Sequence, residues 1–331
     1  MQNNNSVNMI ILDDYQNFFE KMKDDIRLPS IINLSILKKH IENPSDLIDQ
    51  IKNFHIVVGI RERTRFPKAV ITKLPNLRLL ITTGAGNASF DLESATNNNI
   101  VVSGTPGAGE GPVDLTWGLI ISLVRGIHTE DSLVRNGKWG TIIGPSLTGK
   151  TLGLLGLGHI GKSVAKVGLA FGMNVIAWSE NLTKEIAVEY GVTYVDKETL
   201  CRQSDILSIH TKLSDRTKGL IATKEINLMK DNVYIINTSR GPIIEESALI
   251  EALNSKKIAG AAIDTFDIEP LPKYHPLLST PNTLITPHIG YVTNEAYEAY
   301  YDGIIENVIT FLNNNPLRVL NPDVLNKIYT K

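Results

Sequence analysis

The chain has 331 residues, and its 33 lysine and arginine residues nearly balance its 35 aspartate and glutamate residues, giving a formal net charge of −2. At roughly 150 residues per domain, this length predicts two domains that each bury a core. Hydrophobic residues make up 42% of the chain and charged residues 21%, which is typical of globular proteins and excludes a disordered chain. Because there is no excess of basic residues, we expect no nucleic-acid partner.

The start of the chain and its cysteine content bear on location. Residues 1–6 contain no basic cluster and no long apolar run, so we expect neither a signal peptide nor a membrane anchor. Cys201 is the single cysteine, which excludes an intrachain disulfide and is typical of a reducing compartment. The sequence therefore predicts a cytoplasmic protein with no membrane partner and no metal site.

The first part of the chain alternates between apolar runs of strand length and segments of helical period. The runs lie at residues 7–12, 56–60, 77–82 and 100–102, and a helix is expected at 14–23. Such alternation predicts a parallel sheet with crossover helices. A glycine- and proline-rich stretch at 104–112 interrupts the pattern before a long apolar helix at 113–127.

A second alternating series begins after Gly149. Strands are expected at 152–155, 174–178, 205–210, 232–237, 259–264 and 283–286, and helices at 160–171 and 184–190. This series predicts a complete doubly wound sheet. A last helix, 293–313, and the tail, 315–331, lie beyond it, and we expect the tail to return to the first domain.

A glycine pattern joins the first strand of the second series to its helix. Gly156, Gly158 and Gly161 form G-x-G-x-x-G. The first glycine permits a tight turn, the second lets the backbone approach a pyrophosphate, and the third lets helix and strand pack closely. The unpaired N–H groups of the helix N-terminus favour an anion, so the pattern predicts dinucleotide binding.

The end of the next strand is where the adenosine ribose is expected. An acidic side chain there bonds the ribose hydroxyls and disfavours a 2′-phosphate, whereas an arginine accepts it. Ser179 occupies the expected acidic position, Glu180 follows it, and no arginine is close. NAD is favoured, and NADP stays open.

Three later strands are followed by side chains suited to oxo-acid chemistry. Arg240 offers bidentate donors to a carboxylate and a carbonyl oxygen. His288 can give and take a proton near neutral pH, and Glu269 can hold its ring. Because the carboxyl ends of parallel strands meet at one edge, the three side chains are expected to share a crevice. Asp264 and Thr238 are expected to bond the nicotinamide carboxamide.

Taken together, these segments resemble the D-isomer-specific 2-hydroxyacid dehydrogenase family, including its phosphoglycerate dehydrogenase-like members. The resemblance covers essentially the whole second domain and implies that Arg240, Glu269 and His288 are the catalytic residues. It also implies cofactor contacts from Gly156, Gly158, His159, Ile160, Gly161, Ser179, Glu180, His210, Thr211, Thr238, Ser239, Asp264 and Gly290. Tyr291 departs from the family's pattern, where a small residue is usual at this position.

The first domain resembles the family's substrate domain less closely. After the strand at 77–82, the amides of Gly84, Ala85 and Gly86 are expected to face the substrate carboxylate. Arg61 follows the strand at 56–60, where some members place a substrate-binding arginine. Arg240 is the expected substrate contact from the second domain.

The resulting fold prediction is α/β, with two doubly wound parallel-sheet domains. A Rossmann dinucleotide-binding domain at 109–299 is inserted into a flavodoxin-like substrate domain formed by 1–108 and 300–331. We expect a homodimer, on the resemblance and on the apolar helix at 113–127 with the arm at 129–139.

The predicted function is hydride transfer between NAD(H) and a 2-hydroxy acid/2-oxo acid pair. Two alternatives remain: a dinucleotide-sensing, corepressor-like binding protein, and a dehydrogenase of the same fold that acts on formate or phosphite. The substrate side chain, the preferred direction and the pathway are left open.

Overall fold

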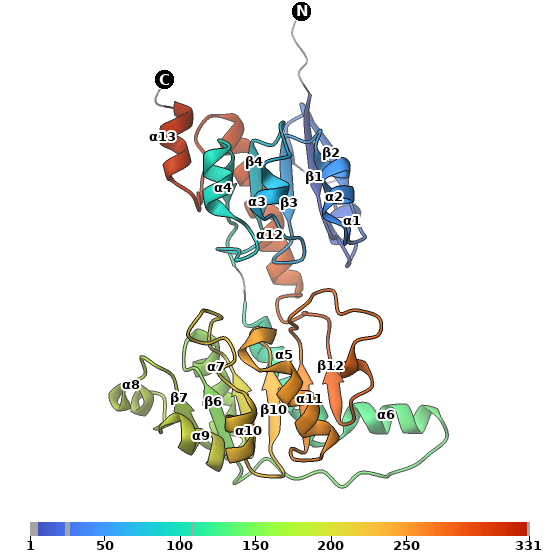
Figure 1. Ribbon diagram of the computed structural model, residues 1–331, viewed down its shortest axis with the longest axis vertical. Helices are drawn as coiled ribbons and strands as arrows, with labels where there is room; N and C mark the ends of the chain where they lie inside the picture. The colour runs from blue at the N-terminus through green and yellow to red at the C-terminus, as the bar shows by residue number, and fades with distance from the viewer. Residues whose placement is uncertain (1–5, 24–26, 108, 330–331) are drawn as a thin grey trace, which may run out of the picture. The chain divides into compact units, whose positions relative to one another are not determined.

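The structure is a computed structural model that describes residues 6–23, 27–107 and 109–329 (Figure 1). The chain divides into two compact units, one formed by Met1–Gly109 with Thr293–Lys331 and the other by Glu110–Val292. Residues 1–5, on which the expectation of no leader rests, lie outside the described residues, as does residue 108 at a predicted domain limit. The limit expected at 299 and 300 falls inside one continuous helix, α12 (Asn294–Leu312).

The first unit contains a five-stranded parallel sheet. Its strands are β1 (Val7–Ile11), β2 (Ile32–Ile36), β3 (Ile56–Gly59), β4 (Leu79–Thr82) and β5 (Val101–Ser103). Their order, β2-β1-β3-β4-β5, is the flavodoxin-like order. This agrees with the predicted class of fold. Strand β2 was not predicted, because its side chains are half-buried or exposed and form no continuous apolar run.

Short helices and the C-terminal segment complete the first unit. The helices are α1 (Phe18–Lys21), α2 (Pro44–Ile51), α3 (Lys68–Ile71), α4 (Leu92–Asn97), α12 and α13 (Asp323–Tyr329). The predicted start of the first helix at residue 14 is wrong, because the buried Asp14 carboxylate instead accepts the amide of Phe18 at 2.9 Å. Asn321 ties the tail to β5, since its side-chain oxygen accepts the amide of Val102 at 2.8 Å.

The second unit contains a seven-stranded parallel sheet. Its strands are β6 (Thr151–Leu155), β7 (Asn174–Trp178), β8 (Thr193–Tyr194), β9 (Ile206–Ile209), β10 (Tyr234–Asn237), β11 (Gly260–Ile263) and β12 (Thr283–Ile285). The order β12-β11-β10-β9-β6-β7-β8 reverses direction beside β6, which is the Rossmann arrangement that places a ligand at the reversal. Only the short edge strand β8 was missed by the pattern of apolar runs.

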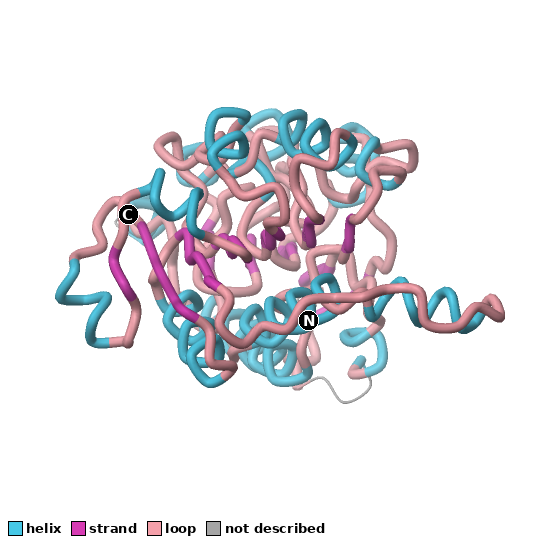
Figure 2. Tube along the Cα trace, turned by 90° about the horizontal axis from the view of Figure 1, so that it is seen from below, coloured by secondary structure: helices cyan, strands magenta, loops and turns pink. Residues whose placement is uncertain are grey.

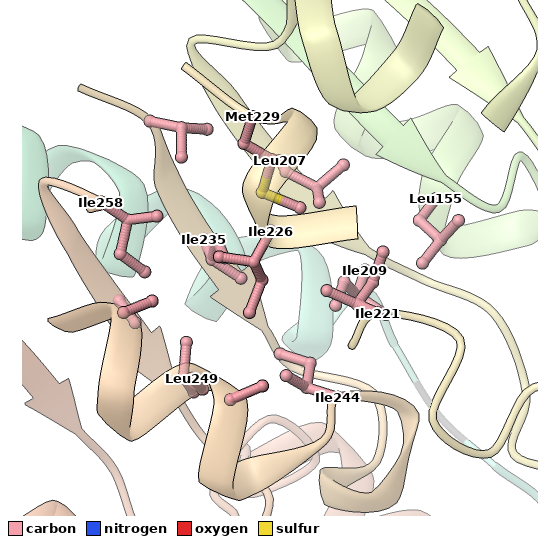
Figure 3. Close-up of a cluster of buried hydrophobic side chains, with 14 of the residues drawn as sticks. Leu155, Leu207, Ile209, Ile221, Ile226, Met229, Ile235, Ile244, Leu249 and Ile258 are labelled. Atoms are coloured by element: carbon pink, nitrogen blue, oxygen red, sulfur yellow. The ribbon is translucent and has the colours of Figure 1, made fainter. Parts of the chain in front are cut away.

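Helices cover both faces of this sheet (Figure 2). They are α5 (Gly111–Val124), α7 (His159–Ala170), α8 (Lys184–Glu189), α9 (Lys197–Gln203), α10 (Thr223–Leu228) and α11 (Glu246–Asn254), with 3₁₀ turns η2 (Gly241–Ile243) and η3 (Pro276–Leu278). Helix α6 (Ile127–Arg135) buries no residue and extends away from the sheet (Figure 1). Neighbouring residues on one strand face opposite cores: Ile235 packs with α10 and α11 (Figure 3), and Ile236 with α5 and α7. Burial on both faces explains why the strands read as apolar runs without alternation.

Candidate active site

The glycine turn after β6 has the geometry of an anion-binding cradle. Gly156 has φ +106°, and a Cβ on it would lie 2.8 Å from the carbonyl carbon of His210. A Cβ on Gly161 would lie 2.2 Å from the carbonyl oxygen of Gly156. Gly158, the N-cap of α7, has no atom within 4 Å of where a Cβ would be. The turn is therefore closed to side chains where it packs and open over the helix N-terminus, which fits a dinucleotide pyrophosphate.

A cavity of 720 Å³ extends from this turn along the carboxyl ends of the central strands. The predicted cofactor residues that line it are Gly156, Gly158, His159, Ile160, Ser179, Glu180, His210, Thr211, Thr238 and Ser239, and Arg240 lines it as well. The other predicted cofactor residues do not line this cavity. Gly161 packs against the backbone of Gly156, and the amide of Gly290 donates to the carboxylate of Asp264. Lys212 and Arg216 also line the cavity, although neither was among the predicted cofactor contacts. They belong to the loop after β9, where Thr217 donates a hydrogen bond to the carbonyl of Lys212 at 2.7 Å.

His159, at the start of α7, is held by a neighbouring carboxylate. Its Nε2 lies 2.9 Å from Oε1 of Glu110, and 77% of its side chain is exposed. The side chain is therefore accessible at the mouth of the helix N-terminus, where the sequence predicts contact with the pyrophosphate.

His210, directly after β9, is half-buried and neutral. Burial lowers its pKa from the ordinary 6.5 to about 4, and its Nε2 is hydrogen-bonded to the hydroxyl of Ser208 at 2.8 Å. His210 therefore adds no imidazolium charge to the cavity wall at neutral pH.

This burial predicts a pH dependence of folding stability. Between about pH 6.5 and pH 4 the unfolded chain binds a proton that the folded chain excludes, so His210 makes stability fall as the pH falls. Its contribution to the free energy of unfolding should drop by about 2 kcal/mol between about pH 8 and pH 5. Urea unfolding of the wild type and His210→Gln at both pH values measures this. An equal pH-induced loss in the two proteins would contradict it.

The predicted acid–base pair comes from the segments that follow β11 and β12. Nδ1 of His288 lies 2.7 Å from Oε2 of Glu269, and the two side chains are 16% and 24% exposed. The other carboxylate oxygen, Oε1, accepts the amide of Phe266 at 2.8 Å. Since an ionised carboxylate accepts only, the proton of this bond is assigned to Nδ1, which leaves Nε2 as the atom available for proton exchange.

Asp264 holds the turn that carries His288. Its Oδ1 accepts the amide of Ile289 at 2.9 Å and the hydroxyl of Thr286 at 2.6 Å, and its Oδ2 accepts the amide of Gly290 at 3.1 Å. Burial raises the pKa of Asp264, and these hydrogen bonds oppose the rise. The expected bond from Asp264 to the nicotinamide stays a prediction. Its carboxylate already fixes a backbone in which His288 has φ +51°, a conformation rarely adopted by residues other than glycine.

Arg240 follows β10, which neighbours β11 in the sheet. Its Nη1 donates to the carbonyl of Ser239 at 2.7 Å, and the side-chain amide of Asn237 donates to the carbonyl of Arg240 at 3.0 Å. A Cβ on Gly241 would lie 2.3 Å from the carbonyl carbon of Phe266. The Arg240 turn thus packs directly on the segment that binds Glu269, which puts all three predicted catalytic residues at one edge of one sheet.

The predicted substrate residues Arg61, Gly84, Ala85 and Gly86 belong to the first unit. Arg61 also has φ +51°, and its Nη1 lies 2.0 Å from where a Cβ on Gly84 would be. The amide of Gly84 donates to the hydroxyl of Thr105 at 2.7 Å, so Gly84 is not the free donor that we expected. In the described part of the chain, the amides of Ala85 and Gly86 donate to no protein acceptor.

The described residues contain neither a membrane-spanning helix nor a cluster of metal-ligating side chains. Among the described residues, no helix is both long enough and apolar enough to cross a membrane. Across the same ranges, no three histidine, cysteine, aspartate or glutamate side chains are grouped to hold a metal ion.

Known proteins share this combination of sequence and fold. Residues 117–290 match the model for D-isomer specific 2-hydroxyacid dehydrogenase, NAD binding domain. Glyoxylate reductase from Aeropyrum pernix is 38% identical over 267 residues, which cover 77% of this chain and 80% of the relative. D-3-phosphoglycerate dehydrogenase from Methanocaldococcus jannaschii is 39% identical over 258 residues, but the match spans only 49% of its length. Phosphoglycerate oxidoreductase from Vibrio cholerae superposes with a TM-score of 0.87 at 32% identity, covering 93% of this chain and 99% of that structure.

The fold, the glycine cradle and the family match of the second unit define an NAD-binding oxidoreductase. The chain belongs to the D-isomer-specific 2-hydroxyacid dehydrogenase family. The predicted family, fold class and NAD cofactor are thereby confirmed.

Proposed function

We propose that this protein reduces a 2-oxo acid to the 2-hydroxy acid, and catalyses the reverse oxidation, with Arg240, Glu269 and His288 as its catalytic residues. The bound nicotinamide supplies or accepts the hydride. The observation that carries the proposal is the 2.7 Å bond between His288 and Glu269 at the sheet edge shared with Arg240.

Each residue has a distinct part. The guanidinium of Arg240 binds the substrate carboxylate and polarises the oxo group. His288 donates a proton from Nε2 to the oxo oxygen during reduction and takes it back during oxidation. Glu269, fixed by the amide of Phe266, orients the imidazole through its bond to Nδ1.

Formate oxidation and dinucleotide sensing make less use of this site. Formate oxidation breaks a C–H bond without moving a hydroxyl proton, so it has no need of a His288–Glu269 pair. A corepressor-like protein would bind the dinucleotide without needing an acid–base group over the substrate. The complete pair therefore favours oxo-acid reduction.

For the cofactor we favour NAD over NADP. Glu180 lines the cavity beside Ser179, and a carboxylate at the ribose disfavours a 2′-phosphate. Lys212 and Arg216 line the same cavity, and their positive charges favour a 2′-phosphate. Comparing NADH and NADPH directly therefore belongs in the first assay.

That assay follows absorbance of the reduced nicotinamide with glyoxylate, pyruvate, hydroxypyruvate, phenylpyruvate and branched 2-oxo acids, and in the reverse direction with formate and phosphite. The proposal predicts oxidation of NADH by at least one oxo acid and no reduction of NAD by formate or phosphite. Tight NADH binding without turnover of any oxo acid would contradict it and favour the binding protein.

We further infer that the protein acts as a homodimer in the cytoplasm. Helix α6 and the loop after it extend beside the second unit (Figure 1) and expose apolar side chains, including Trp139 at 87% and Ile143 completely. Exposed apolar surface of this kind marks a protein interface, and a second copy of the chain is the occupant that we propose.

The dimer is tested by replacing both side chains, Trp139→Ser with Ile143→Asp. We expect the molar mass from light scattering to fall from that of a dimer to that of a monomer. Tyr274→Ser, which removes an equally exposed aromatic ring (88%), should leave the dimer intact. A monomeric wild type at micromolar concentration would refute the inference.

A further inference from the structure

Tyr291 lies against the proposed acid–base histidine. The centroids of its ring and the imidazole of His288 are 5.4 Å apart, with an interplanar angle of 75°, which is an edge-to-face aromatic contact. The role proposed above for His288 needs Glu269 but does not require an aromatic neighbour. The phenol ring therefore needs an explanation of its own.

The backbone fixes this ring in place. The carboxylate of Asp264 accepts the amides of Ile289 and Gly290, and the amide of Val292 donates to the carbonyl of Ile289 at 2.8 Å. These bonds close a tight turn with Gly290 and Tyr291 at its centre. The same carboxylate thus fixes the backbone that carries both His288 and Tyr291.

The strand order places Tyr291 at the same sheet edge as the other two side chains. Arg240 follows β10, and His288 and Tyr291 follow β12, the edge strand two places away. A 2-oxo acid with its oxo oxygen at Nε2 of His288 holds C2, and with it the start of its remaining substituent, next to the imidazole. A substituent of several carbons therefore comes within reach of the ring that packs against that imidazole.

We propose that Tyr291 is a specificity-determining residue that limits the substrate to 2-oxo acids whose remaining substituent is hydrogen or a single carbon with its hydroxyl. The inference rests on the proposed function and adds the substrate class. The ring occupies the space beside the imidazole, so a branched or aromatic substituent meets Tyr291 before its oxo oxygen reaches Nε2. Glyoxylate and hydroxypyruvate fit this limit, whereas 4-methyl-2-oxopentanoate and phenylpyruvate do not.

The test compares kcat/KM for these four oxo acids in the wild type, Tyr291→Ala, Tyr291→Ser and Tyr291→Phe. Wild type should prefer the two small acids. In Tyr291→Ala and Tyr291→Ser, the ratio of kcat/KM for 4-methyl-2-oxopentanoate over glyoxylate should rise by about tenfold or more, the scale on which a pocket discriminates a few methylenes. Tyr291→Phe, which keeps the ring, should keep the wild-type ratio, as should the matched control Tyr274→Ala on an exposed loop.

The outcomes distinguish a failure of the role of Tyr291 from a failure of the proposed oxo-acid reduction. Turnover of oxo acids with the same ratio in wild type and in whichever of the Ala and Ser variants folds would overturn the role of Tyr291 alone. A wild type that prefers phenylpyruvate to glyoxylate would overturn it as well. A wild type that binds NADH yet reduces no oxo acid would overturn the proposed function and this inference with it.

Discussion

Replacing His288 by asparagine is expected to lower kcat/KM for oxo-acid reduction by about a thousandfold, the midrange for loss of a positioned general acid. Asparagine removes Nε2, the atom from which the oxo oxygen would receive its proton. The effect should fall mainly on kcat, because the interaction with the proton is made in the transition state. Steady-state kinetics with NADH and glyoxylate, together with the dissociation constant for NADH, measure this.

A histidine of similar surroundings provides the control. Nε2 of His275 lies 3.0 Å from Oε1 of Glu246, and its side chain is 13% exposed, so it is also a half-buried histidine paired with a glutamate in the second unit. His275→Asn should leave kcat/KM within about twofold, because His275 is paired with Glu246 and not with a residue of the proposed catalytic set. If His288→Asn behaved like His275→Asn, His288 would not be the acid.

The second large effect is expected at Arg240. Arg240→Gln should lower kcat/KM by about a hundredfold or more, equivalent to ~3 kcal/mol, since truncating one side of a desolvated charge pair costs 2–5 kcal/mol. Because the guanidinium binds the carboxylate before and during the reaction, KM should rise as well as kcat fall. The kcat/KM of Arg240→Lys should lie between those of the wild type and Arg240→Gln, because lysine keeps the charge but loses the planar pair of donors.

A loss of affinity for oxo acids without a loss of NADH binding distinguishes this result from a folding defect. Arg202→Gln, on the exposed surface of α9, should be unchanged in kinetics and in NADH binding. Arg240→Gln should bind NADH within a few-fold of wild type while losing affinity for oxo acids. An unchanged KM for every oxo acid would contradict the role given to Arg240.

Sequence reasoning located the second unit well for physical reasons. Strands buried on both faces leave continuous apolar runs, and the glycines at 156 and 161 are required because any Cβ there would strike backbone. The rule that parallel strands present their carboxyl ends at one edge was enough to group Arg240, Glu269 and His288, which are far apart in the sequence. Edge strands β2 and β8 escaped notice because half-exposed residues carry no such signal.

What the sequence could not predict is how side chains satisfy one another. Nothing in the order of residues indicates that the amide of Gly84 is taken by Thr105 or that Asp264 holds the turn around Ile289 and Gly290. Both contacts join segments that are far apart in the sequence and are brought together only by the packing of the folded chain. Arg216 was likewise not predicted as a cavity residue, because a basic residue in a loop reads as ordinary surface charge.

Transfer of deuterium tests the central claim most directly. Wild-type protein is incubated with glyoxylate or hydroxypyruvate and NADH carrying deuterium on both positions of nicotinamide C4, and the product is examined by mass spectrometry and NMR. We predict deuterium bound to C2 of the 2-hydroxy acid with wild type, and strongly reduced transfer with His288→Asn and Arg240→Gln. Product without deuterium, or equal transfer by all three proteins, would contradict hydride transfer by this site.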